Sequence, residues 1–149
     1  MTVMLLSDWR RLIMPAELYH QRTIIEDAKK ISNLTFAVKL SHRFMSGIPD
    51  LLLSVPGYQP TFVEVKKVDG NWNKNTIKVN TTPLQRSTMR AMTESGLRVE
   101  VWVAVEDGSD TYMLRVRPEM TTIQCDWWTL PKRKRGEGWP IADFLKNPV

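Results

Sequence analysis

The sequence has few of the residues that cross-link small proteins. Its 149 residues include one cysteine, Cys125, and two histidines, His20 and His42. A single cysteine cannot form a disulfide within the chain, and this set is too small for a zinc site made of cysteine and histidine. A chain of this length can bury a sufficient core without either device. We therefore expect one domain, in a reducing compartment.

Long apolar runs are also missing. No segment approaches the roughly 18 apolar residues that a membrane-spanning helix needs. The short run at residues 3–6 is followed closely by Asp8, which is unlike the core of a signal peptide. We therefore expect a cytoplasmic protein that does not associate with a membrane.

Positive charge is in excess, with 21 Lys and Arg against 16 Asp and Glu, a net charge of +5. A basic chain favours an anionic partner, and nucleic acid is the commonest one. The excess is most concentrated at residues 131–138, where Lys132, Arg133, Lys134 and Arg135 are consecutive. Because such a run is more often a plain solvated segment, it does not identify a DNA-binding surface on its own.

Hydrophobic spacing predicts an α/β fold with a mixed sheet covered by helices. The predicted strands cover residues 35–40, 49–55, 61–67, 97–105 and 111–117. The first three form an antiparallel meander, and the third and fourth form a parallel pair joined by a helix. In the first strand, Phe36, Val38 and Leu40 lie on one face.

Two longer helices are predicted, over residues 15–32 and 82–96. The second has clear end signals, because Thr82 is suited to the N-cap, Gln85 completes a capping box and Gly96 ends the helix. We expect Pro15 at the first position of the other helix.

The remaining segments are interpreted from composition. Residues 68–81 are polar and rich in asparagine, which is typical of a mobile loop. A basic, tryptophan-rich extension covers residues 118–149, with short helices expected near residues 120–128 and 140–145. The core of the single domain is then expected over about residues 15–117.

An acidic and a basic side chain project together from the third predicted strand. Glu64 and Lys66 are two residues apart and share a face, whereas Val63 and Val65 lie on the other. Alone, this is most often an ordinary surface pair. Asp50, however, stands directly before three leucines, where a charge is costly to bury. A short hairpin would bring Asp50 close to Glu64 and Lys66.

These residue types suit metal-assisted hydrolysis. Two carboxylates that meet at about 4–6 Å repel one another unless a cation lies between them, and oxygen ligands favour Mg²⁺. The backbone carbonyl of Val65 can add a neutral ligand. Lys66 can hold or deprotonate a water and can stabilise negative charge on a phosphate. The combination predicts hydrolysis of phosphodiesters.

The same residues carry a family resemblance. GIPD at residues 47–50, EVK at residues 64–66 and a helix that opens with TPLQR at residues 82–86 together resemble the PD-(D/E)XK nuclease superfamily. More narrowly, they resemble its VRR-Nuc branch, with Holliday-junction-resolvase-like members in phages and bacteria. The resemblance covers roughly residues 17–105. It implies a restriction-endonuclease-like core in the order αβββαβ, with an extra C-terminal strand and short helices.

The resemblance implies a role for each matching residue. Asp50 and Glu64 would be metal-binding carboxylates, with the Val65 carbonyl beside them, and Lys66 would be the catalytic lysine. Gln85 would help to orient the lysine or the attacking water. A capping box explains Gln85 equally well without any catalytic role.

A further acid is implied on the first helix. Glu17 fits as a catalytic residue and metal ligand, although the helix macrodipole alone also favours an acid in a first turn. Glu26 is the alternative, because the distance from this helix to the first strand varies.

The implied activity is that of a Mg²⁺-dependent DNA endonuclease, with Mn²⁺ as a possible substitute and no nucleotide cofactor. The resemblance favours branched DNA as substrate and a bacterium or a phage-infected cell as source. A resolvase cuts two strands symmetrically, which implies a homodimer. The alternatives are a general nicking or recombination nuclease, a non-catalytic nucleic-acid-binding module, and an interaction protein whose carboxylates are surface charges.

Several other side chains are candidates for contact with DNA. Trp72 can stack on an unpaired base, whereas Trp102 is expected to pack inside, and Trp127, Trp128 and Trp139 in a core or a dimer interface. The full set of candidate DNA-binding residues is His42, Arg43, Lys67, Trp72, Arg86, Lys132, Arg133, Lys134 and Arg135.

Overall fold

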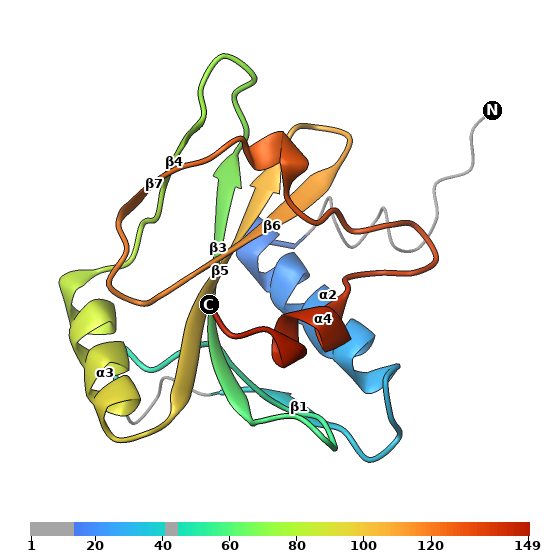
Figure 1. Cartoon of the computed structure of the whole chain (residues 1–149), viewed down its shortest axis with the longest axis vertical. Helices are drawn as coiled ribbons and strands as arrows, with labels where there is room; N and C mark the ends of the chain where they lie inside the picture. The colour runs from blue at the N-terminus through green and yellow to red at the C-terminus, as the bar shows by residue number, and fades with distance from the viewer. Residues whose placement is uncertain (1–13, 41–44) are drawn as a thin grey trace.

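The computed structural model describes residues 14–40 and 45–149 (Figure 1). The candidate DNA contacts His42 and Arg43 lie outside these residues. In chain order the elements are α2 (Ala16–Lys29), β1 (Phe36–Lys39), β2 (Leu51–Ser54), β3 (Thr61–Asp69), β4 (Thr76–Lys78), α3 (Pro83–Glu94), β5 (Arg98–Glu106), β6 (Thr111–Val116), β7 (Thr122–Gln124), the 3-10 turn η1 (Trp127–Thr129) and α4 (Ile141–Lys146).

Five strands form one mixed sheet in the order β1-β2-β3-β5-β6. Each neighbouring pair is antiparallel except β3 and β5, which are parallel and are joined through α3. The predicted meander and the predicted parallel pair are both confirmed. The fold is of the mixed α/β class, as the sequence pattern indicated.

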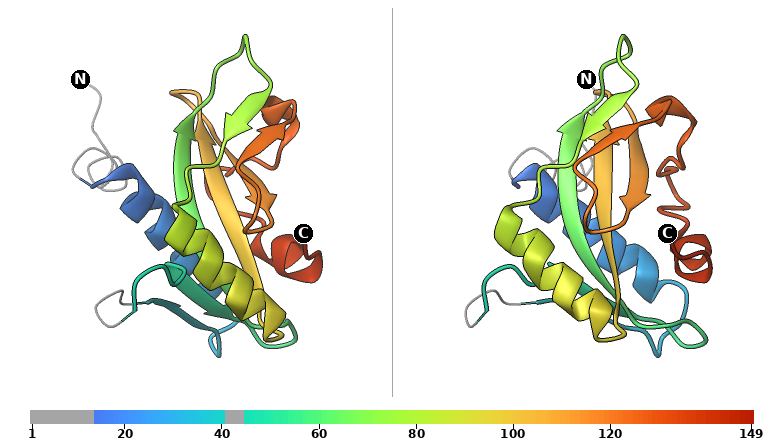
Figure 2. Two further views of the ribbon diagram at one scale, coloured as in Figure 1. Left: turned by 90° about the vertical axis from the view of Figure 1, so that its left-hand side faces the viewer. Right: turned by 60° about the vertical axis from the view of Figure 1, so that its left-hand side comes forward.

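Helices cover both faces of this sheet. On one face, α2 and α4 pack over Val63, Val65 and Trp102, and on the other, α3 packs over the odd-numbered valines of β5. In the left-hand view of Figure 2, α3 crosses in front of the long strands β3 and β5, and α2 passes behind them. Side chains of β5 are therefore buried on both faces, and only its last residue, Glu106, is partly exposed.

Two predicted segments differ from the structure. Residues 68–81 are not a mobile loop, because β3 continues to Asp69 and β4 pairs with β7. The expected helix near residues 120–128 is instead β7 followed by η1. Both errors have one cause, which is that single apolar residues alternate with polar ones in these short strands. Ile77 and Val79 are buried, and Ile77 pairs with Ile123. The expected helix near residues 140–145 is confirmed as α4.

The first strand is confirmed, but its inner face is not the one with the larger side chains. Ala37 is 2% exposed and faces the core, whereas Phe36 is 57% exposed. The small Ala37, which pairs with Leu53, allows α2 to pack close to the sheet. Helix α2 itself begins one residue after Pro15 and ends at Lys29, earlier than expected.

A buried carboxylate on α2 anchors the C-terminal extension. Asp27 accepts hydrogen bonds from the backbone N–H of Trp139 at 2.8 Å and from Arg133 Nε at 3.2 Å. Gly138 makes this approach possible, because a Cβ there would lie 2.5 Å from the Asp27 carboxyl group. Trp139 therefore reaches the same core as α2, as the sequence predicted for its side chain.

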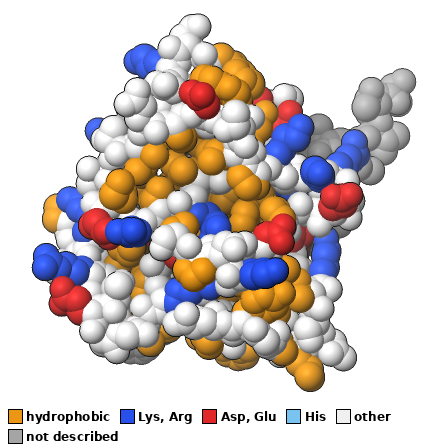
Figure 3. Space-filling view, in the orientation of Figure 1, with side chains coloured by type: hydrophobic (Ala, Val, Ile, Leu, Met, Phe, Trp, Pro, Cys, Tyr) orange, Lys and Arg blue, Asp and Glu red, His pale blue; other side chains and the backbone are white. Residues whose placement is uncertain are grey.

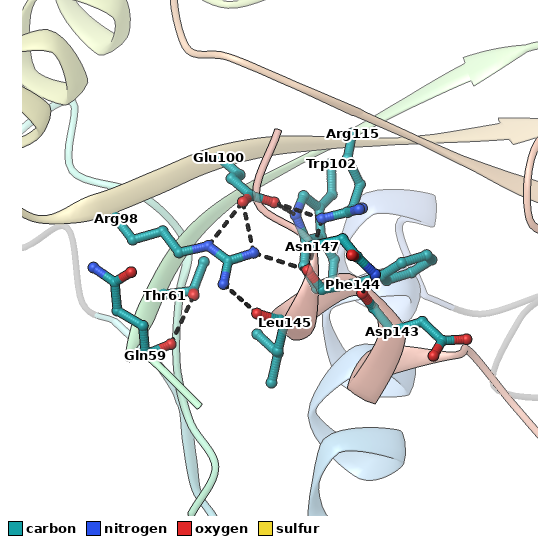
Figure 4. Close-up of polar contacts among 10 residues, drawn as sticks. All are labelled: Gln59, Thr61, Arg98, Glu100, Trp102, Arg115, Asp143, Phe144, Leu145 and Asn147. Carbon is teal, nitrogen blue, oxygen red and sulfur yellow. Dashed lines mark hydrogen bonds and ion pairs between the residues drawn. The ribbon is translucent and has the colours of Figure 1, made fainter. Parts of the chain in front are cut away.

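A second buried carboxylate holds α4 against the sheet (Figure 4). Glu100 is 1% exposed and is bonded by Arg98, Arg115 and the indole N–H of Trp102. Both arginines also donate to the carbonyl of Phe144, near the C-terminal end of α4. Cations at that end of a helix complement its macrodipole, so the network joins residues 98–115 to the extension.

No helix in the described ranges combines the length and the apolar character needed to cross a membrane.

Candidate active site

The β2–β3 hairpin places Asp50 beside the middle of β3. Leu51 pairs with Val63, so Asp50 lies immediately beyond the end of this antiparallel ladder. Its Oδ2 accepts a hydrogen bond from the backbone N–H of Val65 at 2.9 Å, and its own carbonyl accepts one from Leu40 N–H at 2.7 Å. Asp50 is thus held at both its side chain and its backbone.

The Val65 carbonyl lies on the same edge of β3. In a strand, the N–H and C=O of one residue point to the same side. Because the Val65 N–H points to Asp50, the Val65 carbonyl also points toward this edge. The ladder between β2 and β3 ends at Val63, so the Val65 carbonyl is a neutral backbone ligand beside a carboxylate.

Glu64 is a carboxylate in an environment that opposes its charge. It is 2% exposed, and burial, with the negative charge of Asp50 as the next cause, raises the pKa of Glu64 to about 8. Its Oε2 lies 3.4 Å from Lys66 Nζ and accepts a hydrogen bond from Gln85 Nε2 at 3.0 Å. Its buried Oε1 has no hydrogen-bond partner among the described residues. A cation at this oxygen would remove the cost of burying it.

Gln85 serves the helix and the site at once. The Gln85 side-chain Oε1 accepts a hydrogen bond from the backbone N–H of Thr82 at 2.9 Å. The backbone N–H of Gln85 donates to Thr82 Oγ1 at 3.1 Å, which completes the predicted capping box. The remaining Nε2 group donates to Glu64. The capping interpretation and the site interpretation of Gln85 are therefore compatible.

The glycine before the PD pair sets how the loop meets α3. Gly47 has φ +85°, which favours glycine, and a Cβ there would lie 2.8 Å from Thr88 Oγ1 and 3.0 Å from the Leu84 carbonyl. The loop can therefore lie directly against α3. The helix that carries Gln85 and the loop that leads to Asp50 are in this way packed together.

Glu17 lies near the same charges, from the first turn of α2. Burial is the main cause that raises the pKa of Glu17, while Lys66 lowers it and Asp50 raises it. Glu26 is exposed and nine residues further along α2, which at about 100° per residue is the opposite side of the helix. The structure therefore brings Glu17, and not Glu26, close to Asp50 and Lys66.

His20 is a neighbour that the sequence interpretation did not include. It is 1% exposed, its Nε2 lies 2.9 Å from Glu106 Oε1, and its charge acts to lower the pKa of Glu17. The only signal in the sequence is its position three residues after Glu17, which places both on one side of the helix.

The residues present fit a Mg²⁺ ion held mainly by two carboxylates. Over residues 14–40 and 45–149, no group of three His, Cys, Asp or Glu side chains is close enough to hold a metal, so Glu17 does not complete a three-acid cage in this arrangement. Mg²⁺ keeps several waters and is often bound through one or two carboxylates plus substrate phosphates. Asp50, Glu64 and the Val65 carbonyl are such a set.

The structure gives several candidate DNA contacts a partner within the protein. Lys67 lies on the opposite face from Lys66 and pairs with Asp69 at 2.7 Å and Glu106 at 3.5 Å. Arg86 Nη1 donates to the carbonyl of Thr81.

In the basic run, Arg133 pairs with the buried Asp27, and Lys132 Nζ lies 3.8 Å from Asp110. Lys134 and Arg135 are exposed. Of this run, Lys134 and Arg135 therefore present charge to solvent, whereas Lys132 and Arg133 each lie beside an acid.

A mixed sheet whose central hairpin presents Asp50, Glu64 and Lys66, with a glutamine from the following helix, is consistent with the restriction-endonuclease-like fold.

Comparisons with solved structures find similar proteins. The structure is similar to a VRR_NUC domain, with 28% sequence identity, coverage of 58% of this chain and 84% of that chain, and a TM-score of 0.40. It is also similar to Hjc, a Holliday junction resolvase from Archaeoglobus fulgidus, with 15% identity, coverage of 70% and 84%, and a TM-score of 0.44. Both of these neighbours belong to the PD-(D/E)XK-like nuclease superfamily. No protein-family model and no curated protein sequence matches the chain.

Proposed function

We propose that this chain is a divalent-metal-dependent nuclease that hydrolyses phosphodiester bonds in DNA. The observation that carries the proposal is the convergence of Asp50 and Glu64 across the hairpin, with Lys66 at 3.4 Å from Glu64. A buried acid whose ionisation is opposed by a neighbouring carboxylate is stable in its charged form only beside a cation. A lysine at the same point suits a reaction in which a phosphate gains charge.

Asp50, Glu64 and the Val65 carbonyl would hold Mg²⁺, with Mn²⁺ as the possible substitute. When bound, such an ion polarises a phosphoryl oxygen and lowers the pKa of a water. Lys66 is mostly buried, with 13% of its side chain exposed, so its ammonium group is directed by Glu64 rather than free in solvent. In this position Lys66 can orient a water or donate to a phosphate oxygen. Gln85 keeps the Glu64 carboxylate oriented.

DNA is the proposed substrate, because the net charge of +5 favours a polyanion and phosphate contacts supply most of the affinity in such complexes. The resemblance to Holliday-junction-resolvase-like nucleases supports branched DNA and a homodimer as parts of the same proposal. Hydrolysis is a stronger candidate than passive binding, because a DNA-binding module gains nothing from burying the Glu64 carboxyl group close to Asp50.

Cleavage of supercoiled plasmid and of a four-way junction, with Mg²⁺, Mn²⁺ or EDTA, tests the proposal. Asp50→Asn keeps an acceptor for the Val65 N–H but removes the charge, and Lys66→Met removes the ammonium group. Each should lower the rate at least about a hundredfold. Asp69→Asn is the matched control, because Asp69 is an exposed acid on the same strand. Activity that needs no divalent metal, or that survives both substitutions, would overturn the proposal.

A further inference from the structure

Three tryptophans form a cluster at the end of β3, with ring planes inclined to one another by 31° to 76°. The ring centroids of Trp72 and Trp127 are 4.5 Å apart, those of Trp72 and Trp128 are 5.8 Å apart, and those of Trp127 and Trp128 are 5.6 Å apart. Figure 3 shows hydrophobic side chains gathered at the top of that view, between the tip of the chain after β3 and η1. The sequence predicted a role in packing for Trp127 and Trp128 and a role with unpaired bases for Trp72.

The middle ring supports the other two. Trp127 is fully buried, and its indole N–H donates to the carbonyls of Asn71 at 3.2 Å and Lys74 at 3.1 Å. Gly70 lies against this ring, where a Cβ would be 2.7 Å from it. The segment that carries Trp72 is therefore tied to Trp127 by both packing and hydrogen bonds.

The two outer rings face solvent. Trp72 is 56% exposed and Trp128 is 37% exposed, although each contacts Trp127. Exposed apolar surface is unfavourable relative to buried surface, so two large adjoining rings in water mark a place for a ligand. Rigid, partly exposed indoles are suited to stack on planar groups.

The group lies on the same face of the sheet as the candidate active site. Val68 packs in the cluster that contains Trp127, and it shares a face of β3 with Glu64 and Lys66 because these residues are two apart. Three residues of strand separate Lys66 from Asp69, about 10 Å at the usual rise of a strand. A DNA strand cut beside Lys66 would thus pass within a few nucleotides of the tryptophans.

Basic and acidic side chains both lie near the rings. Residues 70–80 contain two exposed lysines, Lys74 and Lys78, and no acid. Two acids adjoin the group, the exposed Asp69 directly before residue 70 and Asp126 directly before η1. The two lysines can contact the phosphates of a strand, while the local charge is balanced.

We infer that Trp72 and Trp128 form a stacking platform for unpaired bases of a DNA strand that passes the Asp50–Glu64 site. The inference rests on the proposed function and narrows its substrate to DNA with a single-stranded segment, such as a flap or an opened branch. Stacking on aromatic side chains is tolerant of sequence, because every base has a π-face, so no base preference follows.

The test measures binding in EDTA, where cleavage does not interfere. A labelled single-stranded oligonucleotide is compared with an abasic strand of the same length and phosphate charge. Trp72→Ala and Trp128→Ala should each weaken binding of the normal strand about tenfold, and should leave binding of the abasic strand nearly unchanged. Trp72→Phe should keep most of the affinity. Phe36→Ala is the matched control, because Phe36 is 57% exposed on β1, away from this group.

The outcomes separate this inference from the proposed function. Equal losses of affinity for the normal and the abasic strand, or no loss in either tryptophan variant, would overturn the platform even if plasmid cleavage depends on Asp50. A selective loss for the normal strand supports the platform even if no cleavage occurs. Circular dichroism of each variant establishes that the loss is not unfolding, and Trp128→Ala carries the test if the Trp72→Ala variant does not fold.

Discussion

Asp50 Oδ2 accepts a hydrogen bond from the backbone N–H of Val65 at 2.9 Å, across a hairpin of 15 residues. This contact ties the acid that precedes β2 to the strand that carries Glu64 and Lys66. An Asp at this position is therefore neither a turn former nor a misplaced core charge. The Val65 carbonyl points to the same side of β3 as this contact.

Gln85 should influence activity separately from helix stability. Gln85→Glu keeps an acceptor for the Thr82 N–H but replaces the Nε2 donor with a carboxylate facing Glu64, so cleavage should fall at least about tenfold. Thr82→Ala should lower the free energy of unfolding by about 1 kcal/mol and leave cleavage at 25 °C nearly intact. Cleavage rates and urea denaturation of both variants are the measurement. Loss of activity only in proportion to stability in both variants would leave Gln85 with a capping role alone.

The metal-free protein should lose stability as the pH rises from about 5 to 8. The pKa of Glu64 is raised to about 8 in the folded state, above the ordinary carboxyl value of the unfolded chain, so the folded state holds the proton more tightly. The stability that this proton contributes is complete at a pH below the ordinary carboxyl pKa, and it is lost as the pH rises through about 8. The expected loss in EDTA is on the order of a few kcal/mol, seen as a lower urea midpoint.

Glu64→Gln should flatten this pH dependence in EDTA, and Mg²⁺ should stabilise the wild type at pH 8 but not the variant. Glu94→Gln, an exposed carboxylate on α3 that pairs with Arg90, is the control and should behave as wild type. A wild-type midpoint that does not vary with pH in EDTA would contradict the buried, protonated state of Glu64.

Glu100→Gln should destabilise the protein by about 3 kcal/mol, because it leaves Arg98 and Arg115 buried without their counter-charge. Both arginines also bond the Phe144 carbonyl, and Arg115 lies 4.7 Å over the Phe144 ring. In hydrogen exchange, the substitution should therefore accelerate the amides of α4, relative to wild type, more than those of α3. Glu94→Gln is the control for the size of this loss, because it removes only the exposed ion pair with Arg90, which contributes less than about 1 kcal/mol to stability.

The basic run should divide into a structural residue and two candidates for contact with DNA. Arg133→Ala removes a partner of the buried Asp27 and should lower the free energy of unfolding, with no change in the salt dependence of DNA binding. The Lys134→Ala/Arg135→Ala double variant should keep its stability and reduce the slope of log affinity against log salt by about 2. Salt titrations and urea denaturation, measured in EDTA, distinguish the two. The reverse pattern would mean that Arg133 contacts DNA.

Local patterns were reliable where the determining contacts are local. The capping box at Thr82 and Gln85, the helix end at Gly96, and the period of two in β3 and β5 all involve neighbours within a few residues. The same reasoning was wrong for residues 68–81. The three-residue strand β4 forms only by pairing with β7, and the start of β7 at Thr122 is 46 residues after the start of β4 at Thr76. Composition alone cannot reveal a partner at that separation.

The sequence by itself determined the order of the core elements, the hairpin that brings Asp50 to Glu64 and Lys66, and the resemblance to PD-(D/E)XK nucleases. Periodicity, end signals and turn length act over short distances, so they can be interpreted without the fold. Only the tertiary structure decided that Gln85 bonds Glu64, that Glu17 rather than Glu26 lies near the site, and that Arg133 pairs with Asp27. Each of these depends on which side chains meet after distant segments pack, and burial changes the energy of a charge only once that packing is complete.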